Sequence, residues 1–453
     1  MSVVGFDIGN DNCVITVVKQ QGIDVLLNDE SNRETPTVVC FGEKQRFFRS
    51  SGASSAMMNP RSTVTQVKRL IGRRLKDPEV QTNLKTLPFE TSEAKDGGIL
   101  VNLKYLGETH SFAPVQILAM LFSHLKDVAE KNLEMPVVDY VIGIPSYFTD
   151  LQRRAYLDAA KIAGLKPLRL MHDCAATALS YGIYKTDFSS TGPTYVAFID
   201  IGHCDTQVQE SNPFSVGFSS DEGPICTPSS NGILFPRGLS IPSTKVLTFQ
   251  RSSQFHLDAF YADPNELPAG VSSRICTFTI GPLQGSSNDK ARVKVKVQLN
   301  LHGIIAIESA TVVSGHGDDF SMHSPSSESS ADGSRDRGNR RINIPVSETV
   351  YGGMTMAQLS EAHERELELT QQDRIVEQAK EKKNALESYV YEMHNKLFNT
   401  LRSFASDEER EGISRSLQET EEWLYGDGDD ETENAYTTKM QDLKQMMNEC
   451  HKA

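Results

Sequence analysis

One short pattern constrains this chain more than any other: an apolar run that ends in Asp-Ile-Gly occurs twice. The first copy ends at Gly9 and the second ends at Gly202. A glycine after a strand allows a tight turn whose backbone N–H groups can approach an anion, and a neighbouring aspartate can hold a hydrated cation. A single turn of this type is usually only a turn. Two copies predict an α/β fold with paired strand–turn units that suit phosphate binding.

The first 209 residues have the pattern of an α/β lobe. The predicted elements are strands at 3–8, 12–19, 37–41 and 137–144 and helices at 114–131 and 149–163. The second helix has Thr149 and Asp150 in capping position and ends before Gly164. We therefore expect one lobe over 1–209, which includes the second Asp-Ile-Gly turn.

Residues 212–313 have the pattern of a β-sandwich-like domain. Strand-like segments at 244–251, 255–262 and 274–282 are separated by Pro, Gly, Ser and Asn. The clearest strand alternates apolar and polar residues, with Val293, Val295, Val297, Leu299 and Leu301 on one face. His302-Gly303 turns the chain, and an apolar segment follows to 313. Antiparallel strands of this kind predict two packed sheets.

The remaining residues predict a linker and a helical bundle. Residues 314–341 are rich in Ser, Gly, Asp and Arg, so we expect a disordered linker at 314–345. Residues 346–453 have helical periodicity, and the predicted buried face consists of Leu386, Val390, Met393, Leu397, Leu401 and Phe404. The sequence therefore predicts a multidomain protein with an α/β lobe, a β-domain and a helical bundle.

Composition excludes several classes of function. A net charge of −14 argues against nucleic-acid binding as the main activity. No apolar run approaches the length of a membrane-spanning helix, so we expect no membrane partner. The seven cysteines form no CxxC pair, and no secretory signal pattern is visible at the start of the sequence. These features predict a protein of the cytoplasm or nucleus.

The order of these parts resembles the 70-kDa heat-shock protein family, and particularly its large 110-kDa subclass. The resemblance is carried by residues 4–10, 28–36, 67–73, 144–148, 295–303, 384–391 and 422–425. It implies that the first lobe is an actin-like lobe of an ATPase domain, with ATP and Mg²⁺ as cofactors. It also implies unfolded client proteins and a 70-kDa heat-shock chaperone as partners.

The resemblance implies a role for several residues around the two turns. The residues with implied catalytic roles are Lys68, Asp173 and Asp200, and the metal ligands would be Asp7 and Asp200. The residues that would contact the cofactor are Asp7, Gly9, Asn10, Asp11 and Gly202. Without the resemblance, the residues alone favour a solvated helix lysine at Lys68 and a helix cap at Asp173.

Several positions depart from the family pattern. Asn10 and Asp11 stand where ordinary members have threonines, and a carboxylate at 11 repels phosphate where a hydroxyl can donate to it. Asp173 replaces a longer glutamate. His203 and Cys204 replace glycines of the second loop, which hinders close approach of the backbone to phosphate.

The largest departure lies at the junction 209–212. There the sequence passes directly into residues that resemble the start of the family's substrate domain, without the adenosine-binding glycine loop and the crossover helix. The family also has further helices after the position of Met447. We therefore expect weak or absent ATP binding, negligible turnover, and a strand at 194–201 without sheet partners.

Three functions remain open from the sequence. The first is the family role, a chaperone of the 110-kDa class that assists folding and promotes nucleotide exchange on a 70-kDa partner. The second is a nucleotide-independent holdase or interaction protein. The third is a non-functional truncated product. An actin-like sugar kinase is less consistent with the chain, because such kinases lack the β-domain and the bundle.

Overall fold

The computed structural model describes most of the chain, in two compact units. The described residues are 3–19, 22–48, 54, 57–183, 185, 196–204, 206–208, 212–225, 232–283, 290–313, 341–399 and 406–450. The first unit consists of residues 1–40, 47–103 and 109–363, and the second consists of 41–46, 104–108 and 364–453. Among the described residues, none of the helices combines the length and apolar character needed to cross a bilayer.

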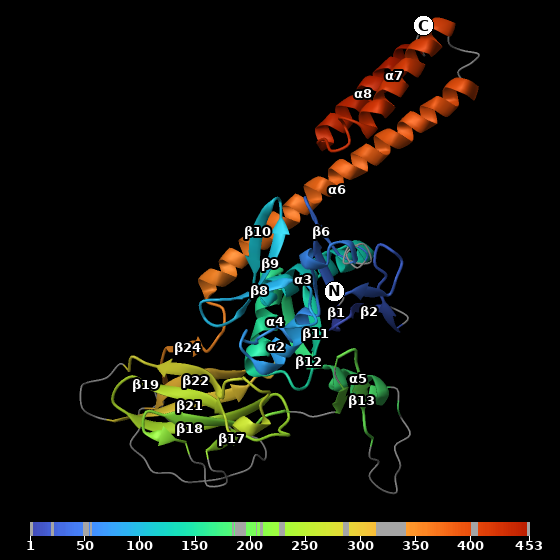
Figure 1. The fold of residues 1–453 in the computed structure, drawn as a ribbon. Helices are drawn as coiled ribbons and strands as arrows, with labels where there is room; N and C mark the ends of the chain where they lie inside the picture. The colour runs from blue at the N-terminus through green and yellow to red at the C-terminus, as the bar shows by residue number, and fades with distance from the viewer. Residues whose placement is uncertain are drawn as a thin grey trace, which may run out of the picture. The chain divides into compact units, whose positions relative to one another are not determined.

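A mixed sheet forms the centre of the α/β lobe (Figure 1). Its strand order is β12-β11-β1-β2-β3, with β4 beside β2. β1 is parallel to β11 and antiparallel to β2. The strands are β1 (Val4–Ile8), β2 (Asn12–Lys19), β3 (Gly22–Val25), β4 (Glu34–Pro36), β11 (Asp139–Ile144) and β12 (Lys166–His172).

Two helices, α3 (Pro114–Leu133) and α4 (Asp150–Ile162), lie side by side in the lobe (Figure 1). An aromatic contact joins α3 to the sheet, because the Phe6 ring centroid lies 6.4 Å from that of Phe122, and within the sheet it lies 5.1 Å from that of Tyr140. The Thr149 hydroxyl caps α4 by accepting from the backbone N–H of Gln152. The cap and both helices lie where the sequence predicts them.

The described part of residues 38–112 includes two small sheets and several short helices. The sheet orders are β6-β5-β7 and β10-β9-β8. The elements are β5 (Val38–Phe41), β6 (Arg46–Phe47), η1 (Pro60–Ser62), β7 (Thr63–Thr65), η2 (Val67–Arg69), α2 (Pro78–Leu84), β8 (Glu90–Glu93), β9 (Ile99–Tyr105) and β10 (Glu108–Phe112).

The lobe ends in α5 (Asp173–Ile183) and a two-stranded ribbon of β13 (Ile199–Ile201) and β14 (Thr206–Val208). The prediction that the strand at 194–201 has no sheet partners is wrong in one respect, because β13 pairs antiparallel with β14. Within the described residues the ribbon joins no other sheet. Ile199 and Ile201 are consequently 62% and 76% exposed. A ribbon of this size is marginal by itself, so its stability depends on contacts with the lobe.

The β-domain consists of two antiparallel sheets that enclose one core. The sheet orders are β16-β15-β19-β20-β24, with β17 beside β15, and β18-β21-β22-β23. Val293, Val295 and Val297 are fully buried between the sheets, as the alternating pattern predicts, whereas Leu301 lies beyond the strand and is half exposed. The elements up to 313 are β15 (Val216–Ser220), β16 (Gly223–Pro224), β17 (Ile233–Phe235), β18 (Ser243–Arg251), β19 (Phe255–Tyr261), η3 (Pro264–Glu266), β20 (Arg274–Ile280), β21 (Ala291–Leu299) and β22 (Ile305–Val313).

The predicted boundary between the linker and the helical bundle is wrong. β23 (Arg341–Asn343) and β24 (Val346–Val350) pair with β22 and β20, so the β-domain continues past residue 345. The physical reason is a short alternation of apolar and polar residues, in which Ile344 is buried in the core of the sandwich. The rest of the predicted linker, 314–340, lies outside the described residues.

Besides 41–46 and 104–108, the described part of the second unit contains most of α6 (Met356–Asn399), α7 (Asp407–Tyr425) and α8 (Glu433–Cys450). Leu386, Val390, Met393 and Leu397 are buried in one core with residues of α7 and α8, as their spacing predicts. Leu401 and Phe404 lie outside the described residues. Arg46, which belongs to this unit, is buried and forms ion pairs with Glu366 at 2.8 Å and Asp373 at 2.7 Å.

Candidate functional site

A cavity of about 750 Å³ lies where the turn after β1, the start of α5 and the β13–β14 ribbon meet. Its volume is within the range of small-molecule sites. Every site residue that the sequence predicts lines this cavity: Asp7, Gly9, Asn10, Asp11, Lys68, Asp173, Asp200 and Gly202. The fold thus brings residues from the whole of the first lobe to one place, although their individual roles stay predictions.

The turn after β1 requires glycine at position 9. The Gly9 N–H donates to the carbonyl of Asn12 at 3.0 Å, and a Cβ at position 9 would lie 2.4 Å from that carbonyl oxygen. The Thr37 hydroxyl donates to the Gly9 carbonyl at 3.0 Å and fixes the turn from the other side. The backbone of the turn is therefore held rigidly at the edge of the cavity.

Asn10 presents an unsatisfied acceptor beside this turn. The residue is 8% exposed, and its Oδ1 atom is buried without a hydrogen-bond partner in the part of the chain that the structure describes. An unsatisfied buried acceptor costs about 1–3 kcal/mol, so such an atom normally receives a donor from a ligand or an ordered water. A polar ligand or an ordered water in the cavity would satisfy this atom.

Lys68 supplies the positive charge of the cavity. It lies in η2, is buried, and donates from Nζ to the carbonyl of Ile8 at 2.8 Å. Its Nζ also lies 4.0 Å from Asp173 Oδ2. The alternative of a solvated lysine is therefore wrong, because the ammonium group is held between the first turn and α5.

The carboxylates outnumber this cation. The cavity lining contains one lysine and five carboxylates, which are Asp7, Asp11, Glu34, Asp173 and Asp200. Burial, partly offset by Lys68, raises the pKa of Asp173 to about 6. Burial also raises the pKa of Asp7, where Lys68 acts in the opposite sense and Asp200 adds repulsion. A cavity with this charge attracts cations and repels free phosphate unless a cation accompanies it.

Gln207 belongs to the site, although the sequence analysis does not identify it. Its Oε1 accepts from the Ser146 N–H at 2.9 Å and from the Ser146 hydroxyl at 3.2 Å. Its Nε2 donates to Asp173 Oδ2 at 3.5 Å. The only signal in the sequence is the alternation of β14, which turns this side chain to the face opposite Thr206. Gln207 anchors the ribbon to the lobe and contacts a carboxylate of the cavity.

The second turn differs from the first in its exposure. Gly202 and His203 line the cavity and are exposed, and Cys204 Sγ lies 3.1 Å from His203 Nδ1. Two side chains therefore occupy the turn where a phosphate-binding loop usually presents bare backbone. The two Asp-Ile-Gly units face one cavity, but only the first has the packed geometry of a phosphate-binding turn.

The residues fit a magnesium–phosphate group better than a metal held by protein alone. Among the described residues, no group of three or more His, Cys, Asp or Glu side chains is placed to hold a metal ion. Mg²⁺ commonly takes one or two carboxylates, waters and substrate phosphates, for which Asp7 and Asp200 suffice. The phosphate side of a nucleotide thus has partners in this cavity.

A family model described as "Hsp70 protein" matches the chain in two parts, residues 3–210 and 205–453. The chain is 42% identical to heat shock 70 kDa protein 16 of Arabidopsis thaliana, over 99% of this chain and 85% of that protein. It is 34% identical to heat shock 70 kDa protein 14 of the same plant, over 98% of this chain and 83% of that protein. It is 25% identical to heat shock protein hsp88 of Neurospora crassa, over 98% of this chain and 90% of that protein.

These matches also locate a missing stretch. The alignment with the first Arabidopsis protein extends over 647 positions, whereas this chain has 453 residues, so that protein contains a long stretch without a counterpart here. The family match changes from its first part to its second at residues 205–210. This is the position of the ribbon, next to the junction 209–212 where the sequence departs from the family pattern.

Proposed function

This chain belongs to the Hsp70 family, and on that premise we propose that it is a chaperone of the 110-kDa class that binds non-native proteins without an ATP-driven cycle. The family places it among the heat-shock chaperones, whose ATPase domain closes two lobes around a nucleotide. In this chain the first lobe lacks that partner lobe, so closure around a nucleotide is not available to it.

The exposed β13–β14 ribbon is the observation that carries this proposal. Its two strands form the outer wall of the cavity, yet Ile199 and Ile201 face solvent. In a complete site, apolar strand residues of this kind are covered by further sheet. Without that cover, no second lobe buries the base or excludes water from the phosphates. ATP binding is therefore weak and turnover negligible.

The phosphate side of the site retains a defined, limited capacity. Asp7 and Asp200 would hold Mg²⁺, and Lys68 would lie near the terminal phosphates. When bound, the metal would offset the excess of carboxylates and polarise the phosphoryl oxygens. The protein's own contribution is orientation: the Gly9 turn, Asn10 and Lys68 are fixed by hydrogen bonds or burial before any ligand arrives. This half-site supports affinity for polyphosphate rather than catalysis.

Client binding is proposed for the β-domain because this domain has a complete core. Both sheets contribute to one buried cluster, which includes Phe218, Phe235, Phe255 and Phe278. A domain with its own core can fold and present its loops whether or not the lobe binds a nucleotide. Binding of exposed apolar segments of unfolded proteins then requires no coupling to the cavity.

A light-scattering assay of client aggregation tests this function. The purified chain should suppress aggregation of a heat-denatured client equally with and without ATP and Mg²⁺. The matched control is Asp200→Asn, which changes the cavity and should leave suppression unchanged. Suppression that requires ATP would contradict the proposal and restore the family's ATP-driven cycle. A folded chain that suppresses nothing would support the alternative of a non-functional truncated product.

Calorimetry tests the nucleotide half independently of the client half. We expect no ATP binding in the low micromolar range, because the base lacks its half of the site. Tripolyphosphate with Mg²⁺ should bind about as well as ATP, since both use the same phosphate side. A clear preference for ATP over tripolyphosphate would mean that the base is recognised and would overturn this part of the proposal.

Nucleotide exchange on a 70-kDa chaperone is a second proposed role. The family similarity supports it, because the matched segments cover both units of this chain. The test is the release rate of a fluorescent ADP analogue from a purified 70-kDa chaperone after addition of this chain. Acceleration supports the role, and an unchanged release rate contradicts it.

A further inference from the structure

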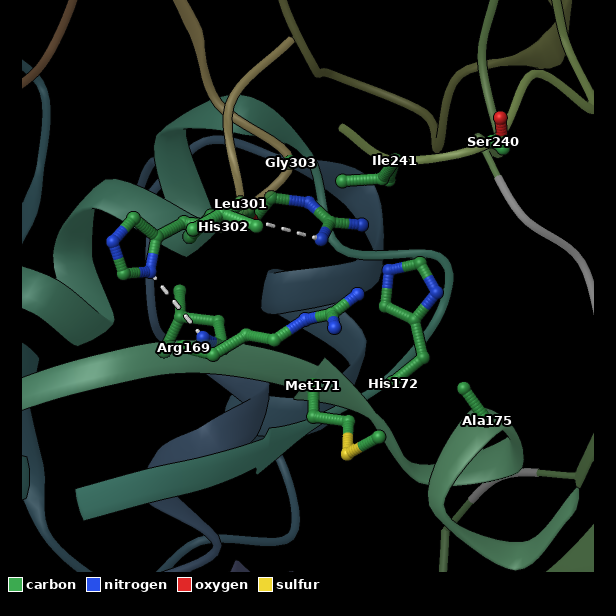
Figure 2. A pocket seen from close by; sticks show the side chains of 11 residues that line it. Arg169, Met171, His172, Ala175, Ser240, Ile241, Leu301, His302 and Gly303 are labelled. Atoms are coloured by element: carbon green, nitrogen blue, oxygen red, sulfur yellow. Dashed lines mark hydrogen bonds between the residues drawn. The ribbon is translucent and has the colours of Figure 1, made fainter. Parts of the chain in front are cut away.

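A second cavity, of about 220 Å³, lies between the lobe and the sandwich (Figure 2). Arg153, Arg169 and His172 line it from α4 and β12, and the turn at His302 and Gly303 lines it from the sandwich. It shares only Met171 with the candidate phosphate site. The inference drawn from it does not depend on the proposed chaperone function.

Arg153 places a buried, poorly neutralised positive charge at this cavity. The residue is 2% exposed. Its guanidinium donates to three backbone carbonyls, at 2.9 Å to Phe148, 3.1 Å to Ser146 and 3.3 Å to His302. Carbonyl groups satisfy N–H donors but carry no net charge, so burial lowers the pKa of Arg153 to about 10.

Arg169 adds a second guanidinium, and one of its donors is unsatisfied. Its Nε is buried and has no hydrogen-bond acceptor among the residues that the structure describes. Figure 2 shows its side chain extending from β12 along the cavity, with the guanidinium pointing toward the His172 ring. A buried donor without an acceptor is costly, and this one lies beside the same space that Arg153 lines.

The neighbouring carboxylates do not balance these charges. The lining of the cavity contains no Asp or Glu within the described ranges. Asp150 acts on Arg153 electrostatically, but its carboxylate is paired with Arg154, which also pairs with Glu348. Arg153 and Arg154 thus share the Asp150 carboxylate. Burial and the nearby Arg169 both lower the pKa of His302, which favours the neutral imidazole beside these guanidinium groups.

We propose that this cavity binds a small tetrahedral oxyanion, of which inorganic phosphate is the best match. Charged donors converge on the space from α4 and from β12, and an anion with acceptors in several directions can use both. A planar carboxylate would be satisfied by one guanidinium fork and would leave the other unpaired. Since the sandwich supplies the turn at His302, a bound anion also stabilises the contact between lobe and sandwich.

Titration calorimetry of the full chain with inorganic phosphate at constant ionic strength tests the proposal. Lys68→Gln removes the cation of the other cavity and should leave this binding in place. Arg169→Gln should weaken phosphate binding about tenfold or more, the effect of losing one charged hydrogen-bond donor. Arg169→Lys keeps the charge but loses the fork, so it should fall between the two. Arg61→Gln, at an exposed arginine of the same lobe, is the matched control and should change nothing.

The outcomes separate the two cavities. Phosphate binding that survives Arg169→Gln but disappears in Lys68→Gln would overturn the proposal, because the anion would then occupy the first cavity. Acetate binding as tight as phosphate would contradict the tetrahedral preference. If Arg169→Gln does not fold, crystals of the unaltered chain soaked in selenate give a second measurement. An anomalous peak between Arg153 and Arg169 supports the site, and a peak only elsewhere rejects it.

Discussion

The attachment of the β13–β14 ribbon gives the sharpest test of this structure. Gln207 holds the ribbon to the lobe through Ser146 and Asp173, and the ribbon belongs to no other described sheet. We expect Gln207→Ala to release the ribbon while the central sheet of the lobe remains folded. The change is therefore a local opening and not global unfolding.

The magnitude follows from the groups left unpaired. The Ser146 N–H is buried and loses its acceptor in the variant, which costs about 1–3 kcal/mol. The 3.5 Å contact with Asp173 is long and adds little. A cost of about 2 kcal/mol raises the local opening constant about 30-fold, because every 1.4 kcal/mol is a factor of ten.

Hydrogen exchange measured by mass spectrometry is the appropriate assay. Peptides that cover 198–208 should exchange about 30-fold faster in Gln207→Ala, and peptides from β1 and β11 should be unchanged. Thr206→Ala is the matched control, because this neighbour on β14 is exposed whereas Gln207 is buried. Equal acceleration in β1 and β11, or unchanged exchange in the ribbon, would refute the reasoning.

Three further predictions concern the first cavity and the second unit. Burial raises the pKa of Asp173 to about 6, so its negative charge opposes folding above that pH, and this cost disappears as the pH falls toward the pKa of the unfolded chain. Asp173→Asn should therefore be more stable than the unaltered chain at neutral pH, by up to about 3 kcal/mol. In differential scanning fluorimetry, the difference in melting temperature between the two should shrink near pH 4. A difference that does not depend on pH would contradict this. Gly9→Ala should lose tripolyphosphate binding in calorimetry, because its Cβ would lie 2.4 Å from the Asn12 carbonyl, whereas Gly182→Ala, with open space around position 182, should bind normally. Arg46→Leu should destabilise the second unit by about 3–5 kcal/mol, since Glu366 and Asp373 would lose their buried ion pairs with Arg46. Faster proteolysis of helical peptides from 364–450 would confirm it, and unchanged proteolysis would contradict it.

Local patterns in the sequence predicted much of the fold because they depend on neighbouring residues only. The Thr149 cap and the Val293–Val297 alternation are examples, and both are present as expected. The sequence does not predict the end of the sandwich, because residues 341–350 follow a stretch with the composition of a linker. The pairing of these residues with β20 and β22 cannot be inferred from so short a segment.

The candidate site was predicted only as far as the family resemblance reached. It identified Asp7, Lys68 and Asp173, which the fold brings to one cavity. Gln207 and Arg169 have no local signature, because their importance comes from which buried groups surround them in space. A lone glutamine on a short strand and an arginine in a strand are typical of surface positions until the structure shows their surroundings.

The pairing of β22 with β23 has a consequence for how this chain can change over time. Val313 lies directly opposite Arg341, so both ends of the intervening segment are fixed as neighbours by the sheet. Lengthening a loop whose ends are already held costs only about 0.6 kcal/mol for each doubling. We therefore expect added residues between Val313 and Arg341 to cost little free energy of folding, so that a reporter domain grafted there should leave the sandwich intact.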